Sequence, residues 1–510
     1  MSIPAFDLAR GKETDVCLIV EGCYPYVLGG VAGWLDWLMR SQPELTFSVV
    51  SIVSGKGPRE SKYVFPDNLL RFCELDLQGP PPTFRARPFK PGEADVQRVV
   101  QILDRFARTG QLEALDDLLH WLRNPQMPPT FHELTQSEFS WRVVTGLYAR
   151  LMPHASFLDF FWAWHTLIRG LLATAMFPLP RARIYHTIST GYAGLFAARA
   201  FLETGHRTIL TEHGIYTNER RLEILMADWI VDTVDKGLRL NDPRMDLRDL
   251  WIRVFESYAR ACYEACETVT TLYSDNQTLQ VNLGAPRHKL AVIPNGIDLA
   301  HFGSVAPPRQ DAPPTMAMVG RVVPIKDVKT FIAAAAAVRH AVPGLRAPIL
   351  GPLDEDPAYF AECRQMVADL GLESIVRFEG RVDVKQWLSS IHVVVLTSLS
   401  EAQPLTLLEA GAAGIPCVTT NVGSCREILL GREDEEPAYG AGGIVTDVVA
   451  PEQIAEGVIA LLTNAQLRQE MGERLQRRVR RFYSSERASN AYRRLYREPA
   501  ASDGASSWQE

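Results

Sequence analysis

Two glutamates eight positions apart carry the strongest chemical signal in this sequence. Glu401 and Glu409 lie within LTSLSEAQPLTLLEAGAAGIPCVTTNVG (396–423), where the pattern predicts a strand, a loop with Glu401, and a helix that opens at Pro404 and carries Glu409. Proline is favoured in a first helical turn because the N–H that it lacks would have no partner there. A helix start can face a phosphate or sugar hydroxyls, and two carboxylates can accept hydrogen bonds from the hydroxyls of a sugar and a ribose. This context disfavours the alternative, a pair of solvated helix-edge charges.

A pair of cations forms the second candidate site, in MVGRVVPIKD (318–327). Arg321 follows a predicted strand, and Lys326 stands five positions later, where a helix is predicted to start. Two such cations can converge on one diphosphate and neutralise the charge that builds on it when a glycosidic bond to phosphate breaks. An isolated Arg and Lys in a loop are usually solvated, so this interpretation depends on the neighbouring glutamate motif.

The first half of the chain offers two weaker candidates. Gly29 and Gly30, in YPYVLGGVAGW (24–34), stand at a predicted helix start, where glycines let the backbone approach an anion or a sugar closely. His213, in TEHGIYTNER (211–220), follows a predicted strand at its carboxyl end. A core or surface histidine is equally compatible with that position, so its role stays open.

Several other function classes find no support in the sequence. There is no G-x-G-x-x-G dinucleotide motif in the opening loop and no G-x-x-x-x-G-K-[ST] phosphate loop. The eight cysteines are thinly scattered without metal-ligand spacing, so we expect no metal and no tightly bound cofactor. A net charge of −7 argues against a dedicated nucleic-acid binder. No charged start precedes an apolar signal stretch, which predicts a cytoplasmic location.

The elements that must position these residues alternate between strands and helices. In the first half, apolar strand-like runs are separated by helices or by a long helical stretch; the runs are 15–22, 46–53, 68–76, 183–189, 207–215, 268–274 and 289–298. In the second half the alternation is more regular, with runs at 315–320, 346–351, 375–380, 392–398, 416–421 and 443–446. Repeated strand–helix–strand winding predicts mostly parallel sheets that are covered on both faces.

The predicted fold class is therefore α/β, with two Rossmann-like, doubly wound domains that face a cleft, where ligands bind at the carboxyl ends of the strands. The predicted divisions are an acceptor-side domain (1–300) with a helical insertion at about 79–182, a nucleotide-sugar domain (301–485), a helix crossing back to the first domain (486–497) and a disordered tail (498–510). A Pro-rich stretch at 305–314 marks the linker.

One segment within the insertion is unusually apolar. Residues 157–177 (FLDFFWAWHTLIRGLLATAMF) approach the length of a membrane span, but Asp159, His165 and Arg169 interrupt them. Central charges cost a few kcal/mol each in a spanning helix, so we expect a helix buried in a core or against a partner.

Taken together, these motifs resemble the GT4 family of retaining glycosyltransferases, which have the GT-B fold. The matching elements are the E-x7-E pair, the G-R-x-x-x-x-K stretch, the VIPNGID segment (292–298) and the early GGV loop. The resemblance implies that Arg321 and Lys326 hold the donor diphosphate, that Glu409 holds the ribose, and that Val382 lies beside the base. It also implies that Glu401 and the backbone of Gln403, Pro404, Leu405 and Thr406 face the transferred sugar, and that His213 lies near the sugar's 6-hydroxyl.

Within GT4, three features are similar to the branch that builds the Pel exopolysaccharide. These are the opening DVCLIVEGCYPYVLGGVAGW, the large helical insertion, and the pair HTISTGYAG and TEHGIYTNER. The resemblance implies a UDP-sugar-dependent hexosyltransferase that extends a polysaccharide acceptor and is recruited to the inner membrane by synthase subunits. The Gly-Phe-Gly usual after the family's first glutamate is Ala402-Gln403-Pro404 here, so the identity of the donor sugar does not carry over.

No second carboxylate is evident at the anomeric centre, so we expect a same-face displacement in which the leaving phosphate helps to deprotonate the acceptor hydroxyl. Two alternatives remain open from the sequence. One is a non-catalytic scaffold that binds a UDP-sugar within a membrane synthase complex. The other is a related GT-B enzyme, such as a sugar-phosphate synthase or a phosphorylase, the latter normally with a lysine-linked pyridoxal phosphate.

Overall fold

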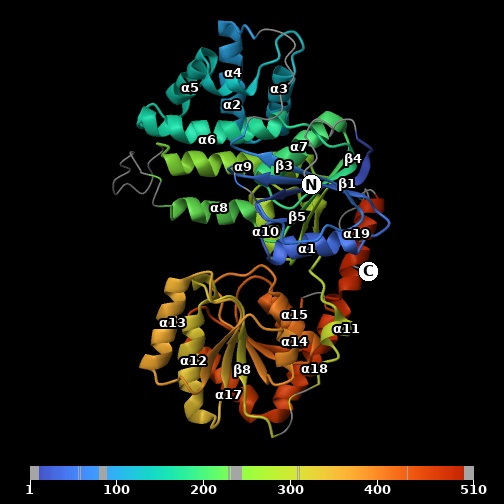
Figure 1. The fold of residues 1–510 in the computed structure, drawn as a ribbon, viewed down its shortest axis with the longest axis vertical. Coiled ribbons are helices and arrows are strands. Elements are labelled where there is room, and N and C mark those ends of the chain that lie inside the picture. The colour runs from blue at the N-terminus through green and yellow to red at the C-terminus, as the bar shows by residue number, and fades with distance from the viewer. Residues whose placement is uncertain are drawn as a thin grey trace. The chain divides into compact units, whose positions relative to one another are not determined.

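The computed structural model describes residues 11–55, 57, 59–79, 89–227, 230, 244–306, 308, 311–432 and 435–498. The chain divides into two compact units (Figure 1). The first contains residues 1–271, 276–292 and 493–510, and the second contains 272–275 and 293–492. The predicted tail lies outside the described residues from position 499 onward, as do positions 80–88 of the insertion.

The first unit is built on a parallel sheet of seven strands in the order β3-β2-β1-β4-β5-β6-β7. The strands are β1 Thr14–Glu21, β2 Phe47–Val53, β3 Leu69–Asp76, β4 Ala182–Thr187, β5 Arg207–Glu212, β6 Thr268–Thr271 and β7 Leu290–Val292. The predicted alternation of strands and helices is confirmed. Strands such as β1 and β2 are apolar almost throughout because helices cover both faces of a parallel sheet.

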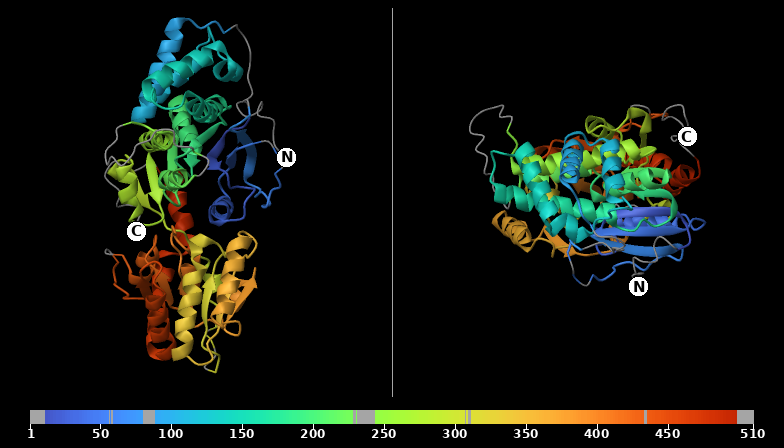
Figure 2. Two further views of the ribbon diagram at one scale, coloured as in Figure 1. Left: turned by 90° about the vertical axis from the view of Figure 1, so that its left-hand side faces the viewer. Right: turned by 90° about the horizontal axis from the view of Figure 1, so that it is seen from above.

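Ten helices accompany this sheet among the described residues, and five of them form the predicted insertion. The connecting helices are α1 Gly30–Arg40, α7 Tyr192–Thr204, α8 Tyr216–Leu225, α9 Leu247–Ala265 and α10 Asn276–Asn282. The insertion contains α2 Glu93–Thr109, α3 Leu112–Leu122, α4 Phe131–Gln136, α5 Glu138–Leu151 and α6 Phe157–Met176. Three insertion helices, α2, α3 and α6, pack on α9, and α3 and α6 also pack on α7; the left view of Figure 2 shows the insertion at one end of this unit.

The insertion shares one hydrophobic core with the sheet. Leu103 of α2, Leu167 of α6 and Ile19 of β1 belong to the same buried cluster. Gly110 ends α2 in the left-handed region (φ 65°), and a Cβ there would lie 2.8 Å from the backbone of Ser257 on α9. Only glycine permits both this backbone conformation and this close approach, which anchors the insertion on α9.

The apolar segment 157–177 forms helix α6; ten of its residues are buried, and eight of these belong to this core. The prediction of a buried helix is thus confirmed for that face, while Leu158 and Trp162 on the opposite face remain exposed. Within the part of the chain that the structure describes, no helix is long and apolar enough to cross a membrane.

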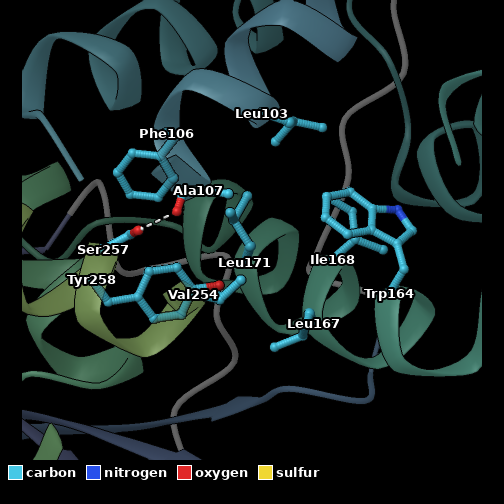
Figure 3. A pocket seen from close by; sticks show the side chains of 10 residues that line it. All are labelled: Leu103, Phe106, Ala107, Trp164, Leu167, Ile168, Leu171, Val254, Ser257 and Tyr258. Carbon is cyan, nitrogen blue, oxygen red and sulfur yellow. Dashed lines mark hydrogen bonds between the residues drawn. The ribbon is translucent and has the colours of Figure 1, made fainter. Parts of the chain in front are cut away.

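A pocket of about 310 Å³, counting the open space at its mouth, lies among α2, α6 and α9 (Figure 3). Its walls are almost entirely apolar; the lining residues are Leu103, Phe106, Ala107, Trp164, Leu167, Ile168, Leu171, Val254, Ser257 and Tyr258. The Ser257 hydroxyl donates to the carbonyl of Ala107 at 3.0 Å. The pocket lies between the insertion and α9, and no residue at a carboxyl end of a strand, where substrates of such folds bind, lines it.

The second unit contains a parallel sheet of six strands in the order β10-β9-β8-β11-β12-β13. The strands are β8 Met316–Val319, β9 Ala347–Leu350, β10 Val376–Gly380, β11 Val393–Leu396, β12 Cys417–Thr420 and β13 Gly443–Thr446. The helices are α11 Leu299–Phe302, α12 Val328–Ala341, α13 Pro357–Asp369, α14 Val384–Leu388, α15 Leu405–Ala412, α16 Cys425–Leu430, α17 Pro451–Thr463, α18 Ala465–Phe482 and α19 Ser485–Arg497.

Side chains alternate between the two faces of this sheet, as the pleat requires. Met316 and Met318 of β8 belong to a core shared with α12 and α17. Ala317, between them, belongs to a second core shared with α15 and α18. The last helix, α19, begins in the second unit, and its residues from Arg493 onward group with the first.

Candidate functional site

Both sheets reverse their strand order beside their first strand. In the first unit the reversal falls between β1 and β4, and in the second between β8 and β11. At such a switch point the loops after the two strands diverge to opposite faces and leave a crevice, which is where open α/β sheets bind their ligands. In the second unit these loops are 320–327 and 397–404, the two segments in which the sequence predicts chemistry.

The centre of the second switch point is an ion pair. Lys326 donates through Nζ to Oε1 of Glu401, and the hydroxyl of Ser398 donates to the same oxygen at 2.6 Å. The side chains of Lys326 and Glu401 are only 20% and 12% exposed, so the pair is largely shielded from bulk water. The structure thus brings a cation and a carboxylate together from the loops that follow two adjacent strands.

The two loops are also joined through their backbones. Leu399 N–H donates to the carbonyl of Ile325 at 2.8 Å, and the Thr397 hydroxyl donates to the carbonyls of Lys326 (3.0 Å) and Asp327 (2.9 Å). These bonds hold the backbone of Lys326 and of its two neighbours, Ile325 and Asp327. A side chain on such a supported loop keeps its position without a ligand, which is the preorganisation that electrostatic catalysis uses.

Arg321 lies at the edge of this arrangement. Its side chain is 52% exposed and pairs with Glu355 at 2.8 Å. The sequence predicts that Arg321 and Lys326 converge on one diphosphate; in the structure each pairs with its own carboxylate. Because an exposed ion pair contributes little to stability, Arg321 can exchange Glu355 for a phosphate at low cost.

The loop that follows Glu401 is held in place by its neighbours. Gln403 accepts a hydrogen bond from the Asn295 backbone N–H at 2.6 Å, and Ala402 accepts one from Ser424 N–H at 2.9 Å. Gly423 has a φ of 52°, and a Cβ there would lie 2.2 Å from the carbonyl oxygen of Glu401. The loop therefore needs glycine at position 423, and its shape is set by a segment beyond the next strand.

The start of α15 differs slightly from the prediction. Pro404 caps the helix instead of occupying its first turn, so the first helical residues are Leu405 and Thr406. Leu405 is 38% exposed, and the Thr406 hydroxyl donates weakly, at 3.5 Å, to the carbonyl of Val319. The N–H groups at this helix start have no intrahelical acceptor and suit an anion or sugar hydroxyls.

Glu409 lies one turn further along α15, and Val382 lies between β10 and α14. Burial raises the pKa of Glu409 to about 7, and among the described residues its carboxylate has no cationic partner. A buried carboxylate without a partner is costly, so hydroxyl donors from a ligand would stabilise its charged form. Val382 is partly buried and packs on the core of this unit.

In the first unit, Gly29 and Gly30 stand at the start of α1, after β1. Gly29 caps the helix with an extended backbone (φ −176°, ψ 175°), and both glycines are exposed. A Cβ at either position would meet no atom within 4 Å, so the space in front of this helix start is open.

His213 follows β5 directly, at the carboxyl end of the same sheet. Its ring packs edge-on against Trp34 of α1 with 4.6 Å between centroids. Burial lowers its pKa to about 4, so the imidazole is neutral at pH 7. Its Nε2 is buried and has no hydrogen-bond partner among the described residues, which leaves one ring nitrogen available to a ligand.

Three features of these edges escaped the sequence reasoning. Ser398 holds Glu401 from three residues away in the same loop, and Asn295, within the VIPNGID segment, holds Gln403 from 108 residues away. Glu21, at the end of β1, accepts hydrogen bonds from Tyr216 OH (2.6 Å) and Ala193 N–H (3.3 Å), and burial raises its pKa. A signal for Glu21 exists, since it is the charged residue that closes the apolar run of β1.

The described residues contain no group of three or more His, Cys, Asp or Glu side chains that could hold a metal ion. All eight cysteines, which lie within the described ranges, are free thiols.

Comparison with known protein families assigns the chain. Residues 14–288, just over half of the chain, match the family described as "Domain of unknown function (DUF3492)". The chain belongs to that family. Residues 304–478 match "Glycosyl transferases group 1", so the second unit is a glycosyltransferase group 1 domain.

Curated relatives are similar mainly over part of their length. The chain is 32% identical over 142 residues to N-acetyl-alpha-D-glucosaminyl L-malate synthase of Bacillus anthracis, covering 28% of this chain and 35% of the relative. It is 29% identical over 245 residues to D-inositol 3-phosphate glycosyltransferase of Kineococcus radiotolerans, covering 44% and 55%. The chain thus spans about a third to a half of these relatives.

Solved structures are similar over nearly the whole chain. HepE of Anabaena, crystallised with UDP and glucose, has a TM-score of 0.56 at 14% identity, covering 95% of this chain and 99% of that one. Sucrose-phosphate synthase from Thermosynechococcus elongatus has a TM-score of 0.55 at 16% identity, covering 94% and 98%. These likenesses confirm the predicted fold class, two Rossmann-like domains of the GT-B type.

Proposed function

We propose that this protein is a retaining glycosyltransferase that moves a hexose from a UDP-sugar to a growing exopolysaccharide of the Pel type. The observation that carries the proposal is the shielded Lys326–Glu401 pair, supported by Ser398, at the switch point of a glycosyltransferase group 1 domain. A cation and a carboxylate fixed together there suit a ligand that carries both phosphate and hydroxyl groups.

Lys326 and Arg321 are the proposed ligands of the donor diphosphate. Lys326 is fixed by the neighbouring loop, whereas Arg321 is exposed and free to turn from Glu355 to a phosphate. Together they neutralise the charge that grows on the leaving UDP, which is the main electrostatic task in this reaction. A UDP donor is also supported by the structures of HepE with UDP and with UDP-glucose, which share this fold.

The carboxylates receive the hydroxyl groups of the donor. Glu409 holds the ribose. Burial raises the pKa of Glu409 to about 7, so hydrogen bonds from two ribose hydroxyls stabilise its charged form. Glu401 and the backbone of Gln403, Pro404, Leu405 and Thr406 face the transferred sugar, while Val382 lies beside the base. Because Lys326 and Ser398 both donate to Glu401, this carboxylate is a poor nucleophile and serves to orient hydroxyls.

The first unit contributes neutral groups. His213 offers an unpartnered ring nitrogen to a hydroxyl of the sugar, and its low pKa keeps it uncharged during the reaction. Gly29 and Gly30 leave room at the start of α1 for a sugar to approach the backbone.

In the proposed mechanism the acceptor hydroxyl attacks the anomeric carbon from the face that the phosphate leaves. The C–O bond to UDP breaks as the new C–O bond forms, and the acceptor proton passes to the departing phosphate oxygen. Configuration is retained without a protein nucleophile. The enzyme's contribution is position and charge, through Lys326 and Arg321, with no divalent ion in the scheme.

The Pel assignment rests on the features that resemble PelF, the glycosyltransferase of Pel exopolysaccharide biosynthesis. It includes a polysaccharide acceptor, recruitment by inner-membrane synthase subunits and reaction at the cytoplasmic face. The eight free thiols agree with a reducing compartment.

The test is sugar transfer by an Arg321→Ala variant beside Arg381→Ala. Both arginines are exposed, and they pair with the adjacent acids Glu355 and Asp354, so the two variants remove similar surface ion pairs. We expect Arg321→Ala to lose about a hundredfold in kcat/KM with weaker UDP binding, and Arg381→Ala to match the wild type. Near-normal turnover of Arg321→Ala would show that the diphosphate lies elsewhere. Wild-type binding of UDP without any turnover across a panel of UDP-sugars and acceptors would favour the scaffold alternative.

A further inference from the structure

A buried chain of hydrogen bonds links the end of the polypeptide to the first sheet. Tyr496, in the last turn of α19, lies 2.7 Å from Nδ1 of His186 on β4. Nε2 of the same ring lies 2.9 Å from the hydroxyl of Thr211 on β5, which lies 2.7 Å from the hydroxyl of Thr270 on β6. His186 and both threonines are fully buried, and Tyr496 is 6% exposed.

The donors of this chain can be ordered from its far end. When the Thr270 hydroxyl donates to the carbonyl of Leu210 (3.2 Å), its oxygen accepts from the Thr211 hydroxyl. Thr211 then accepts from Nε2–H of His186, whose Nδ1 accepts from the Tyr496 hydroxyl. This order satisfies every member and requires a neutral ring, in agreement with the lowering of the His186 pKa to about 3 by burial.

The His186 ring also borders the residue that packs on His213. Trp34 of α1 lies edge-on to His186, with centroids 6.2 Å apart and an interplanar angle of 89°. The His213 ring packs against the same indole, with centroids 4.6 Å apart and an interplanar angle of 76°. Trp34 is 7% exposed, so the indole is confined between two imidazoles. A shift of one ring must therefore displace the next, because close-packed side chains transmit such movements.

We propose that Tyr496 is a positioning residue for the reaction: it fixes His186 as the Nε2–H tautomer and, through His186 and Trp34, sets the orientation of the His213 imidazole. The inference rests on the proposed function of His213 and extends it to the C-terminal helix. The end of α19 is then a working part of the site in the first unit, and not only a structural support.

The test is the Tyr496→Phe variant, which removes one hydroxyl and keeps the ring contacts with His186 (5.7 Å) and Phe47 (6.5 Å). Arg497→Ala is the matched control, because this neighbour on α19 is 58% exposed and makes only a surface ion pair with Glu44. For both variants, kcat and KM for donor transfer, calorimetric binding of UDP and the 15N imidazole spectra are measured. His186 and His213 signals are assigned with His186→Gln and His213→Gln.

We expect Tyr496→Phe to lower kcat about tenfold, since small misplacements of a catalytic group are costly, with KM for the donor and UDP affinity within about twofold of the wild type. The His213 signal should move in Tyr496→Phe and stay in place in Arg497→Ala. An unchanged kcat, or an Nδ1–H tautomer of His186 in the wild type, would overturn the proposal.

Failure of the proposed function is distinguishable, because it would show as absence of UDP binding and transfer in the wild type. The spectra of His186 and His213 decide the positioning claim in that case too. An immobile His213 signal in Tyr496→Phe would contradict it whether or not the wild type is active.

Discussion

The two sheets of this protein have the same winding, but the residues at their carboxyl edges differ in charge. At the β8–β11 edge the central residues are ions: Lys326 pairs with Glu401, and Arg321 lies nearby on the same loop. At the carboxyl edge of the first sheet His213, after β5, is neutral because burial lowers its pKa to about 4, and burial raises the carboxyl pKa of Glu21 and Glu212. The carboxyl edge of the first sheet therefore offers hydrogen bonds and shape, and the β8–β11 edge offers charge.

On the proposed function, this difference follows the two halves of a sugar transfer. A diphosphate leaving group is negatively charged and is stabilised by fixed cations, so it belongs with the charged edge. A sugar or acceptor hydroxyl is uncharged. A charged side chain beside it would add little binding free energy and would itself have to lose water. On the proposed function, the same fold serves two ligand chemistries through the residues at the strand ends, and not through the sheets themselves.

The largest expected effect is at the charged edge, in Lys326→Ala. Removing Lys326 takes away a phosphate ligand and leaves Glu401 as an unpaired, shielded anion. We expect kcat/KM to fall about a thousandfold, with UDP binding also weakened. The matched control is Lys329→Ala, three positions along, where an exposed lysine pairs with Glu362 at 2.7 Å. Equal losses in both variants would remove the distinction between the central and peripheral cations.

At the neutral edge, His213→Ala should separate catalysis from donor binding. The variant removes a hydrogen-bonding group that acts on a hydroxyl, so we expect kcat to fall about a hundredfold. The calorimetric affinity for UDP should stay within about twofold, because the diphosphate ligands are in the other unit. A large loss of UDP affinity in His213→Ala would break the division of labour between the two edges.

Glu212, fully buried at the end of β5, tests how much stability a carboxyl group costs at the carboxyl edge of the first sheet. It accepts hydrogen bonds from Tyr263 OH and Gln280 Nε2, both at 2.9 Å, yet burial raises its pKa from 4.5 to about 7. A raised carboxyl pKa favours the protonated folded state, so this contribution to stability is complete below pH 4.5 and is lost as pH rises to 7. Relative to Glu212→Gln, the wild type should lose about 2 kcal/mol of unfolding free energy across that window in urea titrations. A constant difference between the two proteins would contradict a raised pKa.

Glu409 gives the smallest expected effect. Here a rise in pH is expected to be favourable, because hydroxyl groups of the ligand stabilise the ionised carboxylate. With a pKa of about 7, half of this carboxyl is protonated at neutral pH and cannot accept from both ribose hydroxyls. Affinity for UDP-glucose should therefore rise up to about tenfold from pH 6 to pH 8. Glu409→Gln should bind more weakly and show a flat profile. A wild-type profile that is equally flat would place the ribose away from Glu409.

Much of the fold could be predicted from the sequence because the alternation of strands and helices follows from local runs of apolar residues. Each strand of the second sheet lies within its apolar run, and the segment 157–177 forms the buried helix α6 that its charges indicate. The exception in detail is Pro404, which caps α15 because the chain turns one residue later than the first-turn preference of proline suggests.

The pairing within the sites could not be predicted in the same way. Lys326 and Glu401 are 75 residues apart in the chain, and their ion pair depends on β8 lying beside β11, a matter of strand order that periodicity does not encode. His186 and Tyr496 are 310 residues apart and meet only because α19 ends in the first unit. Motifs indicated the candidate site residues, whereas the partners of these residues depend on tertiary structure.

The most direct test of the central claim is calorimetric titration of the wild type and Lys326→Ala with UDP at pH 8. The account predicts that the wild type binds one UDP per chain and that Lys326→Ala binds at least about a hundredfold more weakly, since it loses a fixed phosphate ligand. Unchanged affinity in Lys326→Ala, or no binding to the wild type, would contradict the assignment of the β8–β11 edge as the sugar-nucleotide site.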